Sequence, residues 1–207
     1  MKHISIPVGG MGNLSHLIGT EGGFGLAVDP AFEPEKVLKI AAENKIKIRY
    51  VFLTHHHFDH IRGTDIIKKR VGAEICAHSA TKTLIAKEVS VDIEVKDGEE
   101  MQIGEQIKVK ILHTPGHALG SICLVVNDTF LVTGDTLFFG NCGRTDLPGG
   151  NSRELFESLQ KIKNLPDNLI ILPGHDYGTK ASSNLGEEKK SSAILKAATF
   201  SEFDALP

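Results

Sequence analysis

The stretch that most constrains the fold of this chain is residues 54–60, with the sequence Thr-His-His-His-Phe-Asp-His. It follows residues 49–53, a short apolar run with β-branched and aromatic members, which predicts a buried strand. Side chains alternate between faces along an extended chain, so His55 and His57 share one face and His56 takes the other. The end of this strand therefore presents two imidazoles toward a common point.

Asp59 and His60 come next, where a helical pattern begins with Ile61, Ile66 and Ile67 on its apolar side. A strand end and a helix start thus offer three imidazoles and one carboxylate. These groups are the ligands that zinc and non-haem iron or manganese accept. A surface tract or a purification tag can also be rich in histidine, but tags lie at chain ends and this cluster follows an apolar strand. We therefore predict a metal site here.

Composition excludes several classes of function. The chain has 207 residues, enough for one large domain or two small ones, and its 41% hydrophobic and 24% charged residues are ordinary for a soluble globular protein. A net charge of −3 without a basic patch argues against nucleic-acid binding. No apolar run approaches the ~20 residues of a membrane helix, and no signal peptide is visible. The three widely spaced cysteines suggest reduced thiols, so we expect a cytoplasmic protein.

The pattern along the chain predicts an α/β (α+β) fold. Apolar runs and alternation, separated by turn residues, predict strands at 3–8, 13–18, 24–28, 49–53, 73–77, 90–95, 107–111, 122–126, 130–133 and 168–172. Helical periodicity predicts helices at 34–44, 59–70 and 152–163, and the polar tail from 181 onward is weakly helical at 191–198. This order fits a four-layer αββα sandwich, two sheets with helices outside, formed by residues 1–207 as a single domain.

Three more potential ligands lie at predicted strand ends, where loops can converge. His117 ends a Thr-Pro-Gly-His turn, Asp135 lies in Thr-Gly-Asp-Thr, and His175 lies in Leu-Pro-Gly-His-Asp-Tyr. Taken alone, each is equally well explained as a solvated turn histidine or a capping aspartate. A metal at residues 55–60 would need a bridging carboxylate and further imidazoles, and these residues could supply them. The remaining histidines are expected to be structural or to orient ligands: His3, His16, His56, His78 and His113.

Read together, these motifs make a recognisable set. The order His55-x-His57-x-Asp59-His60, His117, Asp135, His175 resembles the metallo-β-lactamase superfamily, and the motifs and earlier strands cover nearly the whole chain. Thr-His-His-His-Phe-Asp-His, Gly-Asp-Thr-Leu-Phe and Cys-Gly-Arg are similar to the glyoxalase II (hydroxyacylglutathione hydrolase) group. Gly-Arg-Thr-Asp and Gly-His-Asp-Tyr are also similar to persulfide dioxygenases, which share the fold. The resemblance implies an αββα sandwich with metals at one edge of the sheets.

The resemblance also implies two divalent metal ions, with zinc favoured and iron or manganese suitable. The first ion would be held by His55, His57 and His117, the second by Asp59, His60 and His175, and Asp135 would bridge them together with a hydroxide. Two cations about 3.5–4 Å apart can activate water and stabilise an oxyanion, so no side-chain nucleophile is required. The implied activity is hydrolysis of a thioester by the bridging hydroxide, with Asp59 also acting catalytically by orienting it.

Candidate substrate contacts are Arg144, Asp146 and Tyr177, because the loop at 142–146 follows Asp135 and arginine suits planar anions. Arg144 and Asp146 could instead form a structural pair within the loop. Glyoxalase II proteins carry a C-terminal helical region that helps hold glutathione, whereas only about thirty residues follow His175 here. A small-molecule thioester or thiol conjugate other than that of glutathione is therefore also a candidate substrate.

Two alternatives stay open. A persulfide dioxygenase would use a single iron held by two imidazoles and one carboxylate, for which His55, His117 and Asp135 would serve. A non-catalytic metal-binding or interaction module is the other class, although an open site with this many ligands favours an enzyme. Lactamase and nuclease activities also occur in the superfamily, but the chain shows neither an export signal nor a basic nucleic-acid clamp.

Overall fold

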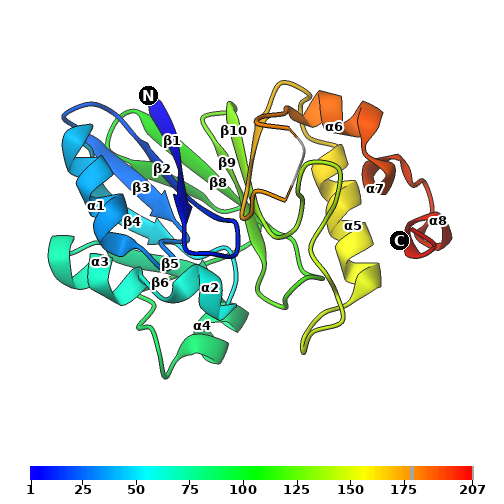
Figure 1. Cartoon of the computed structure of the whole chain (residues 1–207), viewed down its shortest axis with the longest axis horizontal. Coiled ribbons are helices and arrows are strands. Elements are labelled where there is room, and N and C mark those ends of the chain that lie inside the picture. Colours follow the sequence, from blue (N-terminus) through cyan, green and yellow to red (C-terminus); the bar gives the residue numbers. More distant parts are fainter. Residues whose placement is uncertain (178–179, 207) are drawn as a thin grey trace.

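Two sheets packed face to face form the centre of the computed structural model, which describes residues 1–177 and 180–206 (Figure 1). The first sheet contains, in spatial order, β1 (Lys2–Val8), β2 (Asn13–Gly19), β3 (Phe24–Val28), β4 (Lys47–Phe52), β5 (Glu74–His78) and β6 (Ile93–Val95). The second contains β11 (Ile170–Pro173), β10 (Phe130–Gly134), β9 (Ile122–Val126), β8 (Ile107–His113) and β7 (Glu100–Ile103). Strands β3 to β6 pair in parallel, as do β10 and β11, and the other pairs are antiparallel.

Helices cover both outer faces (Figure 1). Those on the first sheet are α1 (Pro34–Glu43), α2 (Phe58–Ile61), α3 (Thr64–Val71) and α4 (Ser79–Ile85). Those on the second sheet are α5 (Ser152–Lys163), α6 (Leu185–Ser191), α7 (Ala193–Lys196) and α8 (Phe200–Asp204). The predicted four-layer αββα fold is thus confirmed. In the described part of the chain, no helix combines the length and the apolar character needed to cross a bilayer.

The strand pattern explains why there are three apolar layers. Neighbouring residues of a strand face opposite ways, so Leu17 packs toward the helices while Ile18 packs toward the other sheet. Val51 and Phe52 divide in the same way on β4. Strands buried on both faces must be apolar at consecutive positions, which is why they read as short continuous apolar runs.

The prediction of one continuous helix over residues 59–70 is wrong. It is divided into α2 and α3 at Gly63, because the chain there passes against the loop after β3. A Cβ atom on Gly63 would lie 1.9 Å from the carbonyl oxygen of Pro30. The division brings the start of α2, with Asp59 and His60, against β3 and its following loop.

The middle of the chain also differs from the prediction. The strand–turn–strand expected from 90–95 through Asp97-Gly98 to 107–111 does not form a hairpin, because β6 belongs to the first sheet and β8 to the second. β8 pairs instead with β7, which the sequence pattern did not predict, and α4 was also not predicted. The tail is helical as expected, but in three short pieces starting at Leu185 rather than 191.

Candidate metal centre

All of the predicted ligands lie at one edge of the two sheets. The segment 54–60 follows β4, and His117, Asp135 and His175 follow β8, β10 and β11. These three strands of the second sheet run in the same direction, since β8 and β10 are each antiparallel to β9 and β11 is parallel to β10. Loops after parallel strands meet at a common edge, so residues up to 120 positions apart come together.

His55, His57 and His117 form the first group of side chains, with ligand atoms all within 4.8 Å of one another. His57 Nδ1 lies 3.0 Å from His55 Nε2 and 3.0 Å from His117 Nε2. The other ring nitrogens of His117 and His55 contact neighbouring residues: His117 Nδ1 donates to the Arg144 carbonyl oxygen at 2.7 Å, and His55 Nδ1 lies 3.0 Å from Thr54 Oγ1. Because these contacts take the protonated nitrogen, the facing nitrogens of His55 and His117 carry lone pairs.

Asp59, His60 and His175 form the second group. His60 Nε2 lies 3.1 Å from His175 Nε2, and Asp59 Oδ2 lies 3.6 and 3.5 Å from these two nitrogens. His60 Nδ1 donates to Asp29 Oδ2 at 2.9 Å, and His175 Nδ1 donates to the Met11 carbonyl oxygen at 3.0 Å. Both rings therefore direct an unprotonated Nε2 toward Asp59 when they are neutral.

Asp135 lies between the two groups. Its Oδ2 is 3.6 Å from His117 Nε2 and 3.3 Å from His175 Nε2, and its Oδ1 is 3.5 Å from His60 Nε2. The residue is 8% exposed, and Oδ1 has no hydrogen-bond partner in the described chain. A single carboxylate thus reaches members of both groups.

Charge and burial give the two groups different protonation. Burial, followed by the neighbouring His117, lowers the pKa of His57 to about 4, and burial also lowers the pKa of His55 and His117. Burial opposes a charge on His60 as well, but the carboxylates of Asp135 and Asp29 outweigh it and raise its pKa to about 9. The first group is therefore neutral at pH 7, while the carboxylates around the second group favour a positive charge between them.

The residues present fit divalent metal ions. Five imidazoles and two carboxylates, a nitrogen and oxygen donor set, are gathered with at most partial exposure. The buried Oδ1 of Asp135 lacks a partner that a cation would supply. Close packing leaves room only for glycine at 174, where a Cβ would lie 2.4 Å from Asp135 Oδ1 and 2.9 Å from His60 Cε1.

Asp29 is the main site residue that sequence analysis missed. It is 3% exposed, and its carboxylate accepts hydrogen bonds from Thr54 N (2.7 Å), Thr54 Oγ1 (2.6 Å) and His60 Nδ1. Both of its oxygens are thus occupied in orienting the 54–60 segment. A signal was available: an aspartate at the end of a strand that neighbours the histidine-bearing strand, where ligating imidazoles need a partner.

Of the three predicted substrate contacts, Arg144 and Tyr177 line the cavity beside the candidate ligands, whereas Asp146 does not. Arg144 donates from Nε and Nη2 to the two carboxylate oxygens of Asp146, each at 2.5 Å, so the loop contains the internal pair considered as the alternative. Both side chains are exposed. Tyr177 stacks on His175, with ring centroids 4.5 Å apart and planes 13° apart, and packs edge-on against Phe138.

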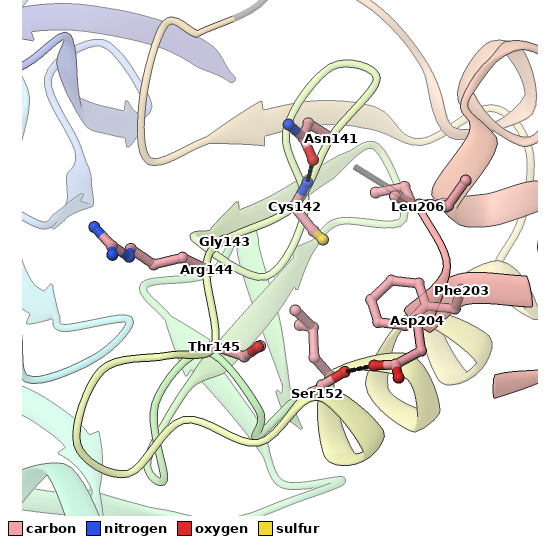
Figure 2. A pocket seen from close by; sticks show the side chains of 11 residues that line it. Asn141, Cys142, Gly143, Arg144, Thr145, Ser152, Phe203, Asp204 and Leu206 are labelled. Carbon is pink, nitrogen blue, oxygen red and sulfur yellow. Dashed lines mark hydrogen bonds between the residues drawn. The ribbon is translucent and has the colours of Figure 1, made fainter. Parts of the chain in front are cut away.

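A cavity of about 470 Å³ opens over the candidate ligands. Its apolar rim consists of Met11, Phe58, Phe138, Leu147 and Tyr177. On the other side of the 141–145 loop lies a second pocket of about 370 Å³, toward α5 and α8. Figure 2 shows the thiol of Cys142 directed into that second pocket and the guanidinium of Arg144 directed away from it.

Known proteins resemble this chain both in sequence and in structure. A family model described as the metallo-β-lactamase superfamily matches residues 8–175. The hydroxyacylglutathione hydrolase of Pelagibacter ubique is 37% identical over 157 residues, which are 75% of this chain and 62% of that protein, so the chain spans less than two thirds of that relative. A crystal structure of ETHE1 from Myxococcus xanthus matches with a TM-score of 0.85 and 28% identity over 100% of this chain and 92% of that one. TTHA1623 in a di-iron-bound form matches with a TM-score of 0.79 and 25% identity over 93% and 100%.

Proposed function

Because the chain belongs to the metallo-β-lactamase superfamily, we propose that it is a metal-dependent hydrolase and that its substrate is a thioester. The observation that carries this proposal is the arrangement of the seven side chains: two groups of three donors with Asp135 between them. The likeness to a hydroxyacylglutathione hydrolase supports the thioester part of the proposal.

In this proposal one divalent ion would be held by His55, His57 and His117, a second would be held by Asp59, His60 and His175, and Asp135 would contribute to both sites. Zinc suits this donor set, and the di-iron-bound neighbour supports iron as an alternative. Divalent ions bound there would supply Lewis acidity and lower the pKa of water from 15.7 to about 7.

The chain itself contributes the orientation of the ligands and the lining of the cavity. Asp29, the Arg144 carbonyl and the Met11 carbonyl fix the rings of His60, His117 and His175 through the nitrogens that face away from the centre. A metal ligand held in this way loses less freedom on binding, and its tautomer is set in advance. Phe58, Phe138 and Tyr177 give the cavity over the site an aromatic lining.

The cavity rim supports a thioester with an apolar part. Four rim side chains, Met11, Phe58, Leu147 and Tyr177, are 36–58% exposed, which is unusual for large apolar residues that gather in one place. Arg144 is the one cationic residue among the described residues that line this cavity, and it is paired with Asp146. We propose that the substrate is a small thioester or thiol conjugate whose apolar part contacts this rim.

The test combines metal content with thioester cleavage. We expect the purified, zinc-loaded chain to hold two ions and to hydrolyse lactoyl-glutathione or a smaller acyl thioester. Asp135→Asn should lower turnover by at least about 100-fold, because it removes the carboxylate that contacts both groups. Asp128→Asn, the same change in the exposed β9–β10 turn, is the matched control and should leave turnover unaffected. One ion per chain together with no thioester cleavage would rule the proposal out.

Persulfide dioxygenation is the second candidate. It is favoured by the Gly143–Asp146 segment and by the likeness to ETHE1 over the full length of the chain. This chemistry would need a single iron, for which His55, His117 and Asp135 are the proposed ligands. Oxygen consumption by the iron-loaded chain with glutathione persulfide separates the two candidates, and no consumption removes the second.

A further inference from the structure

The connection between β1 and β2 reaches into the candidate metal centre. Its backbone holds the segment that carries His175: Leu14 N donates to the Gly174 carbonyl at 2.8 Å, and Asp176 N donates to the Gly12 carbonyl at 2.7 Å. Asn13 forms an isolated β-bridge with His175 itself. A hairpin near the start of the chain thereby positions a ligand candidate more than 160 residues away in sequence.

Asn13 also touches Asp59. Its side-chain nitrogen donates to Asp59 Oδ2 at 3.0 Å and to the Asp59 main-chain oxygen at 3.1 Å. Both acceptors are oxygens, so the amide must present its NH₂ group to Asp59 rather than its own oxygen. Asn13 therefore fixes the carboxylate relative to the backbone that bears it.

The contacts are confined to one of the two ligand groups. Asp59 and His175, which the hairpin holds, both belong to the second group. In the first group, the outward-facing nitrogens of His55 and His117 contact Thr54 and the Arg144 carbonyl. The two candidate ion sites thus have separate supports.

Packing alone does not account for Asn13. The residue is 2% exposed, and its Oδ1 has no hydrogen-bond partner in the described chain. A buried acceptor without a partner destabilises the fold, and an apolar residue of similar volume would avoid that cost. Asn13 is retained here despite that cost, and its NH₂ group donates both of its hydrogen bonds to a ligand candidate. We take this as an indication that Asn13 has a role in the site.

We propose that Asn13 is a positioning residue that sets the affinity of the second ion, at Asp59, His60 and His175, independently of the first. The inference rests on the proposed two-ion hydrolase. Asn13 lies in the β1–β2 hairpin, outside every segment that supplies a ligand. Its contacts with Asp59 then determine how much of the protein holds one ion and how much holds two.

The test is calorimetric titration of the metal-free chain with Zn²⁺. Asn13→Leu removes both donors at similar volume, and Asn13→Asp keeps the shape but places a carboxylate against Asp59. We expect the second binding event to weaken by about 10–100-fold in Asn13→Leu, while the first stays within about twofold. Asn13→Asp replaces the two donors by a second anion beside Asp59, so its second binding event should also change while the first does not. Gly10→Ala is the matched control, because it lies in the same connection with open space around its Cβ position. Thermal unfolding of each metal-free variant checks that it is folded.

Three outcomes would overturn the inference. Two unchanged binding events in either folded variant would show that the Asn13 contacts do not position Asp59. Equal weakening of both events would indicate a general structural role. A wild-type chain that binds one ion and cleaves no thioester would remove the proposed function as well. The first two outcomes, obtained with a wild-type chain that binds two ions and hydrolyses a thioester, leave the proposed function standing.

Discussion

At the scale of single residues, the pair His3 and His16 gives the fold a pH dependence outside the candidate centre. His16 Nε2 donates to the Pro173 carbonyl at 2.9 Å, so its Nδ1 accepts from His3 Nε2 at 3.2 Å. Burial, followed by the neighbouring His16, lowers the pKa of His3 from 6.5 to about 4. Between those two pH values His3 is protonated in the unfolded chain but neutral in the folded chain. Its contribution to the free energy of unfolding is therefore complete above pH 6.5 and is lost as the pH falls toward 4.

The variant His3→Gln tests this dependence, since glutamine keeps an N–H donor for His16 but does not titrate. We expect wild type to lose about 1–2 kcal/mol more stability than the variant between pH 7 and pH 4.5, a range already reduced for the partial exposure of His3. Urea unfolding of both metal-free proteins at the two pH values measures the difference. Parallel losses in the two proteins would show that His3 does not contribute.

Asp29 shows why a residue can be essential to the arrangement and still escape sequence analysis. In sequence, Asp29-Pro30 reads as the end of a strand, which is what it is. Its backbone has a φ of +45°, a conformation that aspartate adopts more readily than most residues. Its partners, Thr54 and His60, are 25 and 31 positions away, and only the parallel pairing of β3 with β4 brings them into reach. The ligand candidates were predictable by type and by strand end, whereas their supports depend on tertiary contacts.

At the scale of elements, close packing overrides helical periodicity at Gly63. The variant Gly63→Ala places a Cβ atom 1.9 Å from the Pro30 carbonyl oxygen and 2.4 Å from that of Ala31. These atoms belong to the backbone and cannot move aside cheaply, so we expect a loss of about 1–3 kcal/mol in the free energy of unfolding. Urea unfolding of the metal-free variant measures it.

Gly10→Ala is again the control, with an expected change within about 0.5 kcal/mol, because a Cβ there meets nothing within 4 Å. If Gly63→Ala proved as stable as wild type, the explanation for the break between α2 and α3 would be wrong.

The elements that could be predicted are those whose own sequence determines them. β9 is apolar at consecutive positions because both of its faces are buried, and the end of β4, at Val51 and Phe52, shows the same pattern, which is visible without a structure. α4 has only two buried residues, Thr81 and Ile85, and its N-cap is His78, whose ring accepts from Ala80 N. Neither the pattern nor the cap is a recognisable helix signal. β7 has four residues, too few for alternation to be distinctive.

At the scale of the whole molecule, the candidate centre joins the two sheets. His55, His57, Asp59 and His60 follow a strand of the first sheet, while His117, Asp135 and His175 follow strands of the second. The backbones also meet nearby, where Ile122 N donates to the Thr54 carbonyl at 2.9 Å. Only the folded chain brings residues of both sheets together to hold an ion. Metal binding would therefore stabilise the folded state.

This linkage predicts that metal removal destabilises the fold. An ion at 100 times its dissociation constant stabilises the folded state by about 2.7 kcal/mol, and each kcal/mol shifts Tm by about 2–4 °C in a chain of this size. We therefore expect a strong chelator to lower Tm by about 5–10 °C at constant pH. Asp135→Asn, which removes the carboxylate that contacts both groups, should show a much smaller difference between metal-loaded and chelated forms, and Asp128→Asn should behave as wild type. Equal Tm values for loaded and chelated wild type would contradict the prediction, because ions that did not stabilise the folded chain could not be held between its two sheets.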